Sequence, residues 1–167
     1  MIIELEQDIS PELVPILEQV SDPEIPVLSI MDMGVVRYAK IIDDTVHVKI
    51  TPTYSGCPAM DVIGDDITAA FAKENKKAVV SLVLAPAWTT DWITPRGRKA
   101  LEAYGIAAPL EAAVDKEALL GGKKVVKCTH CGSLNTKMIS QFGSTACKAL
   151  FQCQDCLEPF DYFKCLK

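Results

Sequence analysis

The sequence CTHCGSLNTKMISQFGSTACKALFQCQDC, residues 128–156, contains two Cys-x-x-Cys pairs separated by 21 residues. Each pair places two thiolates on one tight turn, where both can reach a tetrahedral ion at about 2.3 Å. The pattern therefore predicts one metal ion bound by Cys128, Cys131, Cys153 and Cys156. Soft thiolate ligands favour zinc, with iron as the alternative. Four protein ligands leave no open coordination position, so we expect a structural metal.

Three further residues of this region could also ligate a metal, but they lack the spacing of the two pairs. We interpret Cys147 and Cys165 as small residues of the module's core, with additional ligation as the alternative. His130 lies inside the first pair and is expected to point outward, with replacement of a cysteine ligand as the alternative. The sequence thus assigns four of its seven cysteines to the metal.

The charge of the chain changes where this module begins. Residues 1–122 carry 10 Lys and Arg against 19 Asp and Glu, whereas residues 123–167 carry 7 Lys against 3 Asp and Glu. Such a break indicates a domain boundary. We expect a first domain at residues 1–108, a linker at 109–123 and a zinc ribbon at 124–167. The basic tail has no arginine, which favours a solvated surface over a nucleic-acid site.

Composition and the N-terminal residues predict a cytoplasmic protein. The chain is 49% hydrophobic and 23% charged, which is typical of soluble globular proteins. No apolar run reaches the length of a membrane span. Glu4, Glu6 and Asp8 stand where a secretory signal would carry positive charge. Thiols stay reduced in the cytoplasm, which favours metal binding over disulfides.

The first domain shows the periodicities of an α+β fold. Helical spacing of apolar residues predicts helices at 10–20 and 58–72, and Pro15 leaves a later start of the first helix open. Alternating residues predict a hairpin at 34–42 and 45–50, turning at Asp43-Asp44, and a run of apolar residues predicts a buried strand at 79–84.

A third helix is predicted after residue 94. Thr94 can cap it, Pro95 suits its first position, and Gly105 lies just past its end. The element order α-β-β-α-β-α fits a small two-layer α+β sandwich in front of the ribbon.

Cys57 stands in TPTYSGCP, residues 51–58, directly before the helix that Pro58 is expected to open. Unpaired N–H groups and the positive end of the helix dipole favour a thiolate there, which predicts a lowered pKa for Cys57. The hydroxyls nearby are those of Thr51, Thr53, Tyr54 and Ser55. A buried structural cysteine is the alternative.

Two carboxylates are candidates to act with Cys57. Asp22 and Glu24 lie in a proline-bounded loop that can face it, and a solvated surface is their alternative role. Trp88 and Trp92 flank a further loop and are interpreted as core or interface anchors.

DPEIPVLSIMDMG at residues 22–34, followed by TPTYSGCP, resembles the small α+β domain of the SufT-like iron–sulfur cluster assembly factors. Three further stretches resemble the D-protein family of phenylacetate degradation, which is encoded with the subunits of phenylacetyl-CoA epoxidase. These stretches are PAWTTDWITPRGRKALEAYGIAAP at 86–109, FGSTACKALFQC at 142–153 and EPFDYFKC at 158–165.

This resemblance implies a maturation factor for the epoxidase. It places the family's site on Asp22, Glu24, Thr51, Thr53 and Cys57, with iron or an iron–sulfur cluster held transiently. The implied partners are the epoxidase reductase and oxygenase subunits and the iron–sulfur assembly machinery. A stable cluster normally takes four ligands, so a homodimer, a partner protein or the two carboxylates would have to complete the site.

Three function classes stay open. The first is an assembly factor, the second a non-catalytic structural or regulatory subunit of the oxygenase complex, and the third a thiol-dependent enzyme. The sequence has no nucleotide-binding glycine loop and no histidine near Cys57, which counts against the enzyme.

Overall fold

The computed structural model describes residues 7–109 and 125–164 of the chain. The chain divides into two compact units, Met1–Trp88 and Thr89–Lys167, here called unit 1 and unit 2. The predicted linker lies almost wholly outside the described residues, so the predicted domain limits stay a prediction. No helix in the described part of the chain is long and apolar enough to cross a membrane.

Unit 1 contains a four-stranded sheet in the order β1-β2-β3-β4. Strands β2 and β3 form the predicted hairpin, and Asp43 and Asp44 turn it with φ values of 48° and 60°. Two successive positive φ values match the twist of a tight hairpin, which Asp tolerates. The strands are β1 (Asp8–Ile9), β2 (Val36–Ile42), β3 (Thr45–Ile50) and β4 (Lys77–Leu82).

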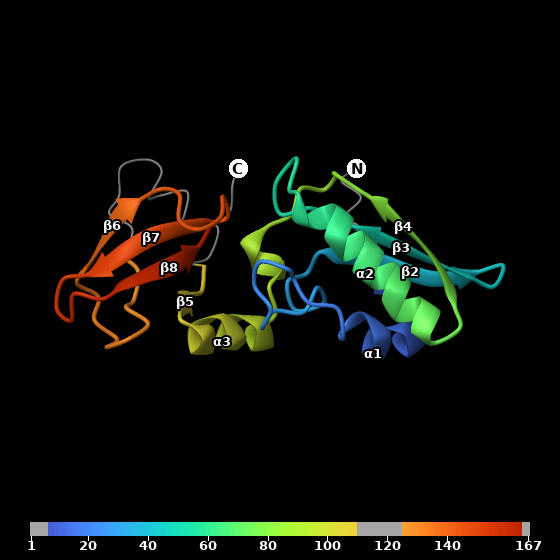
Figure 1. Ribbon diagram of the computed structural model, residues 1–167, viewed down its shortest axis with the longest axis horizontal. Coiled ribbons are helices and arrows are strands. Elements are labelled where there is room, and N and C mark those ends of the chain that lie inside the picture. The colour runs from blue at the N-terminus through green and yellow to red at the C-terminus, as the bar shows by residue number, and fades with distance from the viewer. Residues whose placement is uncertain (1–6, 110–124, 165–167) are drawn as a thin grey trace. The chain divides into compact units, whose positions relative to one another are not determined.

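Helix α2 (Ala59–Lys73) packs on this sheet and connects the parallel strands β3 and β4 (Figure 1). Parallel neighbours need such a crossover connection. As predicted, one apolar face of the helix and the alternate residues of β3 are buried. These residues are Met60, Ile63, Ile67 and Phe71 on α2, and Val46, Val48 and Ile50 on β3.

Two predicted elements of unit 1 differ in the structure. The first helix is a 3-10 turn, η1 (Pro11–Leu13), followed by the short α1 (Val14–Leu17), because Pro15 supplies no N–H and the chain turns after Leu17. The prediction of a buried strand at 79–84 was wrong in its burial. Strand β4 is an edge strand, so Val79 and Leu82 are 46% and 54% exposed.

Unit 2 begins with η2 (Thr90–Trp92) and α3 (Pro95–Tyr104). The hydroxyl of Thr94 accepts a hydrogen bond from the Gly97 N–H at 3.0 Å, and Gly105 ends the helix with φ 92°. The predicted cap and stop of this helix are confirmed.

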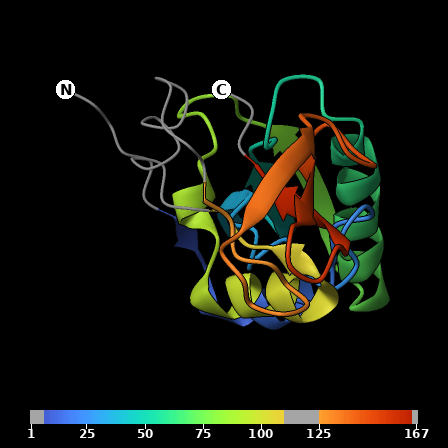
Figure 2. The same cartoon turned by 90° about the vertical axis from the view of Figure 1, so that its left-hand side faces the viewer.

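A second sheet follows, in the order β5-β8-β7-β6 (Figure 1). Its orange and red strands face the viewer in Figure 2. It consists of β5 (Ile106–Ala107), β6 (Thr136–Ser140), β7 (Lys148–Cys153) and β8 (Pro159–Phe163). Phe151 packs edge-on against Tyr162, with ring centroids 5.6 Å apart. Cys128 and Cys153 belong to the same buried cluster as these rings. The chain is thus a two-layer α+β unit followed by a small four-cysteine β ribbon, the predicted fold class.

We expect Phe71→Ala to reduce the free energy of unfolding of unit 1 by about 3–5 kcal/mol, because Phe71 is 0% exposed where α2 meets the sheet. Val62→Ala on the same helix is the matched control, since Val62 is 46% exposed, and should change stability by less than about 0.5 kcal/mol. Urea denaturation measures both. Equal effects of the two changes would contradict this packing.

Candidate metal centre and the Cys57 loop

The two Cys-x-x-Cys turns, here called knuckle 1 (residues 128–131) and knuckle 2 (residues 153–156), have the same local structure. The N–H of Cys128 donates to the Ser133 carbonyl at 2.9 Å, and the N–H of Cys153 donates to the Glu158 carbonyl at 3.0 Å. Both bonds span five residues. The fourth residue after each first cysteine has a positive φ, 77° at Gly132 and 65° at Leu157. The shared turn brings both thiols of each pair to one side.

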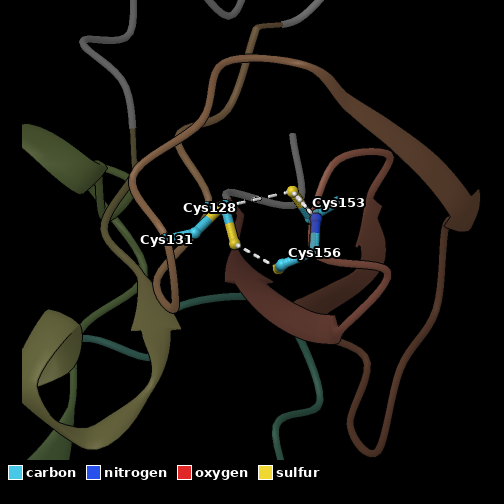
Figure 3. Close-up of side chains that lie close together, drawn as sticks. All are labelled: Cys128, Cys131, Cys153 and Cys156. Atoms are coloured by element: carbon cyan, nitrogen blue, oxygen red, sulfur yellow. Dashed lines mark hydrogen bonds between the residues drawn. The ribbon is translucent and has the colours of Figure 1, made fainter.

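The four sulfurs of the knuckles converge on one point (Figure 3). All lie within 4.8 Å of one another. Two contacts join opposite knuckles: the Sγ atoms of Cys128 and Cys156 are 3.8 Å apart, and those of Cys131 and Cys153 are 3.5 Å apart. Ligands at about 2.3 Å around a tetrahedral ion are about 3.8 Å apart. The sulfurs therefore fit one tetrahedral metal ion, and none of the described cysteines forms a disulfide.

The thiols of this group compete for protons. Backbone N–H groups of Cys156 and Asp155 donate to the Cys153 sulfur and lower its pKa to about 6. The N–H of Glu158 lowers the pKa of Cys156, but burial and the neighbouring thiols raise it more, to about 12. Four thiolates this close cannot all be charged without a counter-ion, and a dication supplies that charge.

The remaining residues near the ribbon behave as core or surface. Cys147 is 5% exposed and lies outside the metal group, and its sulfur is 3.1 Å from the Thr145 hydroxyl. His130 is exposed, as expected, and its backbone N–H donates to the Cys128 sulfur at 3.4 Å. Cys165 lies outside the described residues.

Cys57 lies on a tight turn ahead of α2, here called the Cys57 loop (residues 51–57). Its N–H donates to the Tyr54 carbonyl at 3.2 Å, and Gly56 has φ 77°. Glycine adopts this conformation at no steric cost. The helix begins at Ala59 with Pro58 as its cap, one residue later than predicted. The turn leaves the Cys57 side chain half-buried.

The predicted lowering of the Cys57 pKa was wrong. Burial is the largest cause and raises the pKa of the thiol, and the carboxylates of Glu24 and Asp22 raise it further. Hydrogen bonds from the Ala59 N–H and the Tyr54 hydroxyl lower it, but by less. The hydrogen bond at the start of the helix therefore lowers the Cys57 pKa by less than burial and the neighbouring negative charges raise it.

The rise in the Cys57 pKa also shows that the two predicted carboxylates lie near this thiol. Asp22 and Glu24 lie close enough to Cys57 to act on its charge. Asp22 is 5% exposed, and its Oδ1 accepts hydrogen bonds from the Glu24 and Ile25 N–H groups, both at 2.8 Å. These two backbone donors hold the Asp22 side chain in place.

The two threonines of the Cys57 loop are buried. Thr51 is 1% exposed and Thr53 is 8% exposed, and the Thr51 hydroxyl has no hydrogen-bond partner among the described residues. Within the described ranges, the four ribbon cysteines are the group of ligand atoms that converges closely enough for a metal ion. Cys57 and its two carboxylates do not form a second such group there.

The Tyr54 hydroxyl, one of the four expected near Cys57, donates to the Cys57 sulfur. Sequence reasoning missed one feature of these sites. Asp155 bonds across from knuckle 2 to residues after knuckle 1. Its position inside the second pair was visible, but its partners were not. Trp88 is buried and donates its Nε1–H to the Met33 carbonyl at 2.9 Å, which makes it a core anchor.

Two protein families match separate parts of the chain. Residues 12–82 match the family described as iron–sulfur cluster assembly protein, and residues 112–164 match the PaaD zinc beta ribbon domain.

Individual proteins are similar to longer stretches. The putative D subunit of 1,2-phenylacetyl-CoA epoxidase from Escherichia coli (strain K12) is 47% identical over 156 residues, which cover 93% of this chain and 92% of that protein. The Fe-S protein maturation auxiliary factor YitW of Bacillus subtilis (strain 168) is 33% identical over 100 residues, which cover 58% of this chain and 97% of that protein.

A crystal structure of a domain of unknown function, DUF59, from Bacillus anthracis aligns with a TM-score of 0.50 at 24% identity. The alignment covers 54% of this chain and 88% of that one. This likeness shows the fold.

We expect the rate of Cys57 alkylation to rise with pH and to inflect above the value of about 8.5 of an unperturbed thiol, because its folded pKa is raised. The measurement uses iodoacetamide and mass spectrometry on metal-loaded protein carrying Cys147→Ser and Cys165→Ser. Glu24→Gln should lower the inflection, since it removes one of the negative charges that raise the pKa.

Glu12→Gln removes the same charge from an exposed position in η1 and serves as the control. It should leave the inflection unchanged. An inflection below that of an unperturbed thiol would show that the helix start dominates after all.

Proposed function

This chain belongs to the family of the D subunits of 1,2-phenylacetyl-CoA epoxidase, and on that premise we propose that it is a maturation factor of the epoxidase system. It assists assembly of the iron–sulfur cluster of the reductase or of the iron centre of the oxygenase. The observation that carries this proposal is the match of residues 12–82 to the iron–sulfur cluster assembly family. That range contains Cys57 and the four residues expected to act with it.

The proposed working residue is Cys57. It is the one cysteine of residues 1–127, and its thiolate is a soft ligand for iron. The carboxylates of Asp22 and Glu24 place negative charge beside it, which attracts a cation. When iron binds, the thiol loses its proton to become a ligand.

A single thiolate suits delivery better than storage. Stable clusters are held by four ligands, and Cys57 offers one sulfur. A partner protein or a second copy of the chain must supply the remaining ligands. Iron or a cluster is therefore cargo that passes through this site, and the recipient's own ligands complete its coordination.

A non-catalytic structural or regulatory subunit of the epoxidase complex is the second candidate. The name of the Escherichia coli relative, which calls that protein a subunit of the epoxidase, favours it. The two candidates differ in stoichiometry. A maturation factor is absent from the purified active complex, whereas a subunit stays with it.

The ribbon metal in this proposal is zinc, held by Cys128, Cys131, Cys153 and Cys156. The sulfur spacing and the match to a zinc beta ribbon support this choice. Zinc has no redox chemistry, and a four-thiolate shell leaves it no open position, so its role is to hold the ribbon together.

We expect purified protein to contain about one zinc per chain by elemental analysis. Removal of the zinc with a strong chelator should unfold the ribbon, because a module this small folds on its metal. Circular dichroism follows that loss, and unit 1 should keep its signal. Iron with a rubredoxin-like visible spectrum would instead indicate an electron-transfer ribbon.

We expect Cys57→Ser to abolish maturation while fold and zinc content stay intact. Serine is nearly isosteric, so the free energy of unfolding should change by about 1 kcal/mol or less, but its hydroxyl is a poor ligand for iron. The measurement is the iron–sulfur content of the reductase and the di-iron content of the oxygenase, isolated from cells that carry the variant.

Cys147→Ser makes the same change at a cysteine that lies outside the metal group, and it serves as the control. Cells with this control should mature the epoxidase normally. Normal maturation with Cys57→Ser would refute the assigned role and move the structural-subunit candidate ahead. Loss of one metal centre with the other intact would identify the client.

A further inference from the structure

The carboxylate of Asp155 connects the two knuckles of the ribbon. Asp155 lies inside knuckle 2, between the ligands Cys153 and Cys156. Its Oδ1 accepts a hydrogen bond from the Asn135 Nδ2 at 2.8 Å, and its Oδ2 accepts one from the Ser133 hydroxyl. Both donors lie just after knuckle 1. One side chain of knuckle 2 therefore bonds to the segment that follows knuckle 1.

Hydrogen bonds from two backbone N–H groups join the same segments and complete a ring of bonds, here called the closed frame. The Gln154 N–H donates to the Asn135 carbonyl at 2.8 Å, and the Asn135 N–H donates to the Ser133 hydroxyl at 3.0 Å. The Asp155 N–H also points at the Cys153 sulfur. Asp155 thus bonds through its side chain to the segment after knuckle 1. Through its backbone it contacts Cys153, a ligand of its own knuckle.

We propose that Asp155 is a positioning residue of the four-cysteine site and clasps knuckle 1 to knuckle 2 at metal-binding distance. The two short sulfur contacts, 3.8 Å and 3.5 Å, both join opposite knuckles. Any separation of the knuckles therefore lengthens both contacts together. A clasp that does not involve the metal opposes that separation and slows metal release.

The chemistry of the clasp explains why a carboxylate stands there. Two donors approach the side chain, and a carboxylate offers an acceptor to each. Ser133, Asn135 and Asp155 lie near or at the surface, where single hydrogen bonds add little to stability. Groups beyond the ligands typically change metal affinity by about 10–100-fold, and we place this one near the lower end.

The clasp gives the ribbon metal a role distinct from that of the cargo. A metal locked by a closed frame is resident, and it exchanges slowly with solution. Cargo iron would have to leave on the timescale of delivery. The ribbon is then the fixed part of the molecule, and this inference holds whether or not Cys57 handles iron.

The test is the rate of zinc transfer from full-length protein to a chromogenic chelator in excess, at one pH. Asp155→Ala should release zinc about 10-fold faster than the unchanged protein. Asp155→Asn should restore a rate close to the original, because its amide can accept from Asn135 and donate to the Ser133 hydroxyl. Glu102→Ala removes an exposed carboxylate of α3, outside both knuckles, and should release zinc at the original rate.

The segment after knuckle 1 provides an independent variant. Asn135→Ala should also accelerate release, and combining it with Asp155→Ala should add little, because both remove the same bond. Equal rates for Asp155→Ala and Glu102→Ala would overturn the proposal, as would failure of Asp155→Asn to restore the rate. If Asp155→Ala does not fold, Asn135→Ala alone decides: release at the original rate refutes the clasp.

Discussion

Four cysteine sulfurs within 4.8 Å of one another set the constraint on which unit 2 depends. Cys128 and Cys153 also belong to the buried apolar cluster with Phe151 and Tyr162, so metal coordination and core packing use the same residues. The pKa of Cys153 is lowered and that of Cys156 is raised, which shows that the group cannot hold four negative charges unaided. A dication removes this conflict, and folding of the ribbon is thereby linked to metal binding.

Unit 1 is stabilised by different means. The buried face of α2 covers alternate residues of β3, and the crossover from β3 through α2 to β4 fixes the start of the helix. The Cys57 loop is the connection between β3 and α2, so apolar packing on both sides holds its position. Cys57 can therefore be half-exposed without a cost to the fold.

Features that depend on residues close together in the sequence were predicted correctly. The hairpin at Asp43-Asp44, the cap at Thr94 and the two knuckles follow from turn, cap and spacing rules. Long-range effects escaped the same reasoning. The exposure of β4 depends on its place at the sheet edge, which a run of apolar residues does not reveal. The pKa direction of Cys57 depends on burial and on carboxylates more than thirty residues earlier in the chain.

The two kinds of cysteine in this chain have opposite coordination states. The ribbon sulfurs form a complete tetrahedral shell, and a complete shell cannot accept or deliver a further ion. Cys57 has carboxylates near it but no second thiol in residues 1–127, so its shell is incomplete. Burial and negative neighbours raise the pKa of the Cys57 thiol, and an arriving cation would displace the proton and offset the carboxylates. In the proposed function, this site is therefore a ligand only when cargo is present. Because the proposed site cannot complete the coordination of that cargo, it passes the cargo to a protein that can.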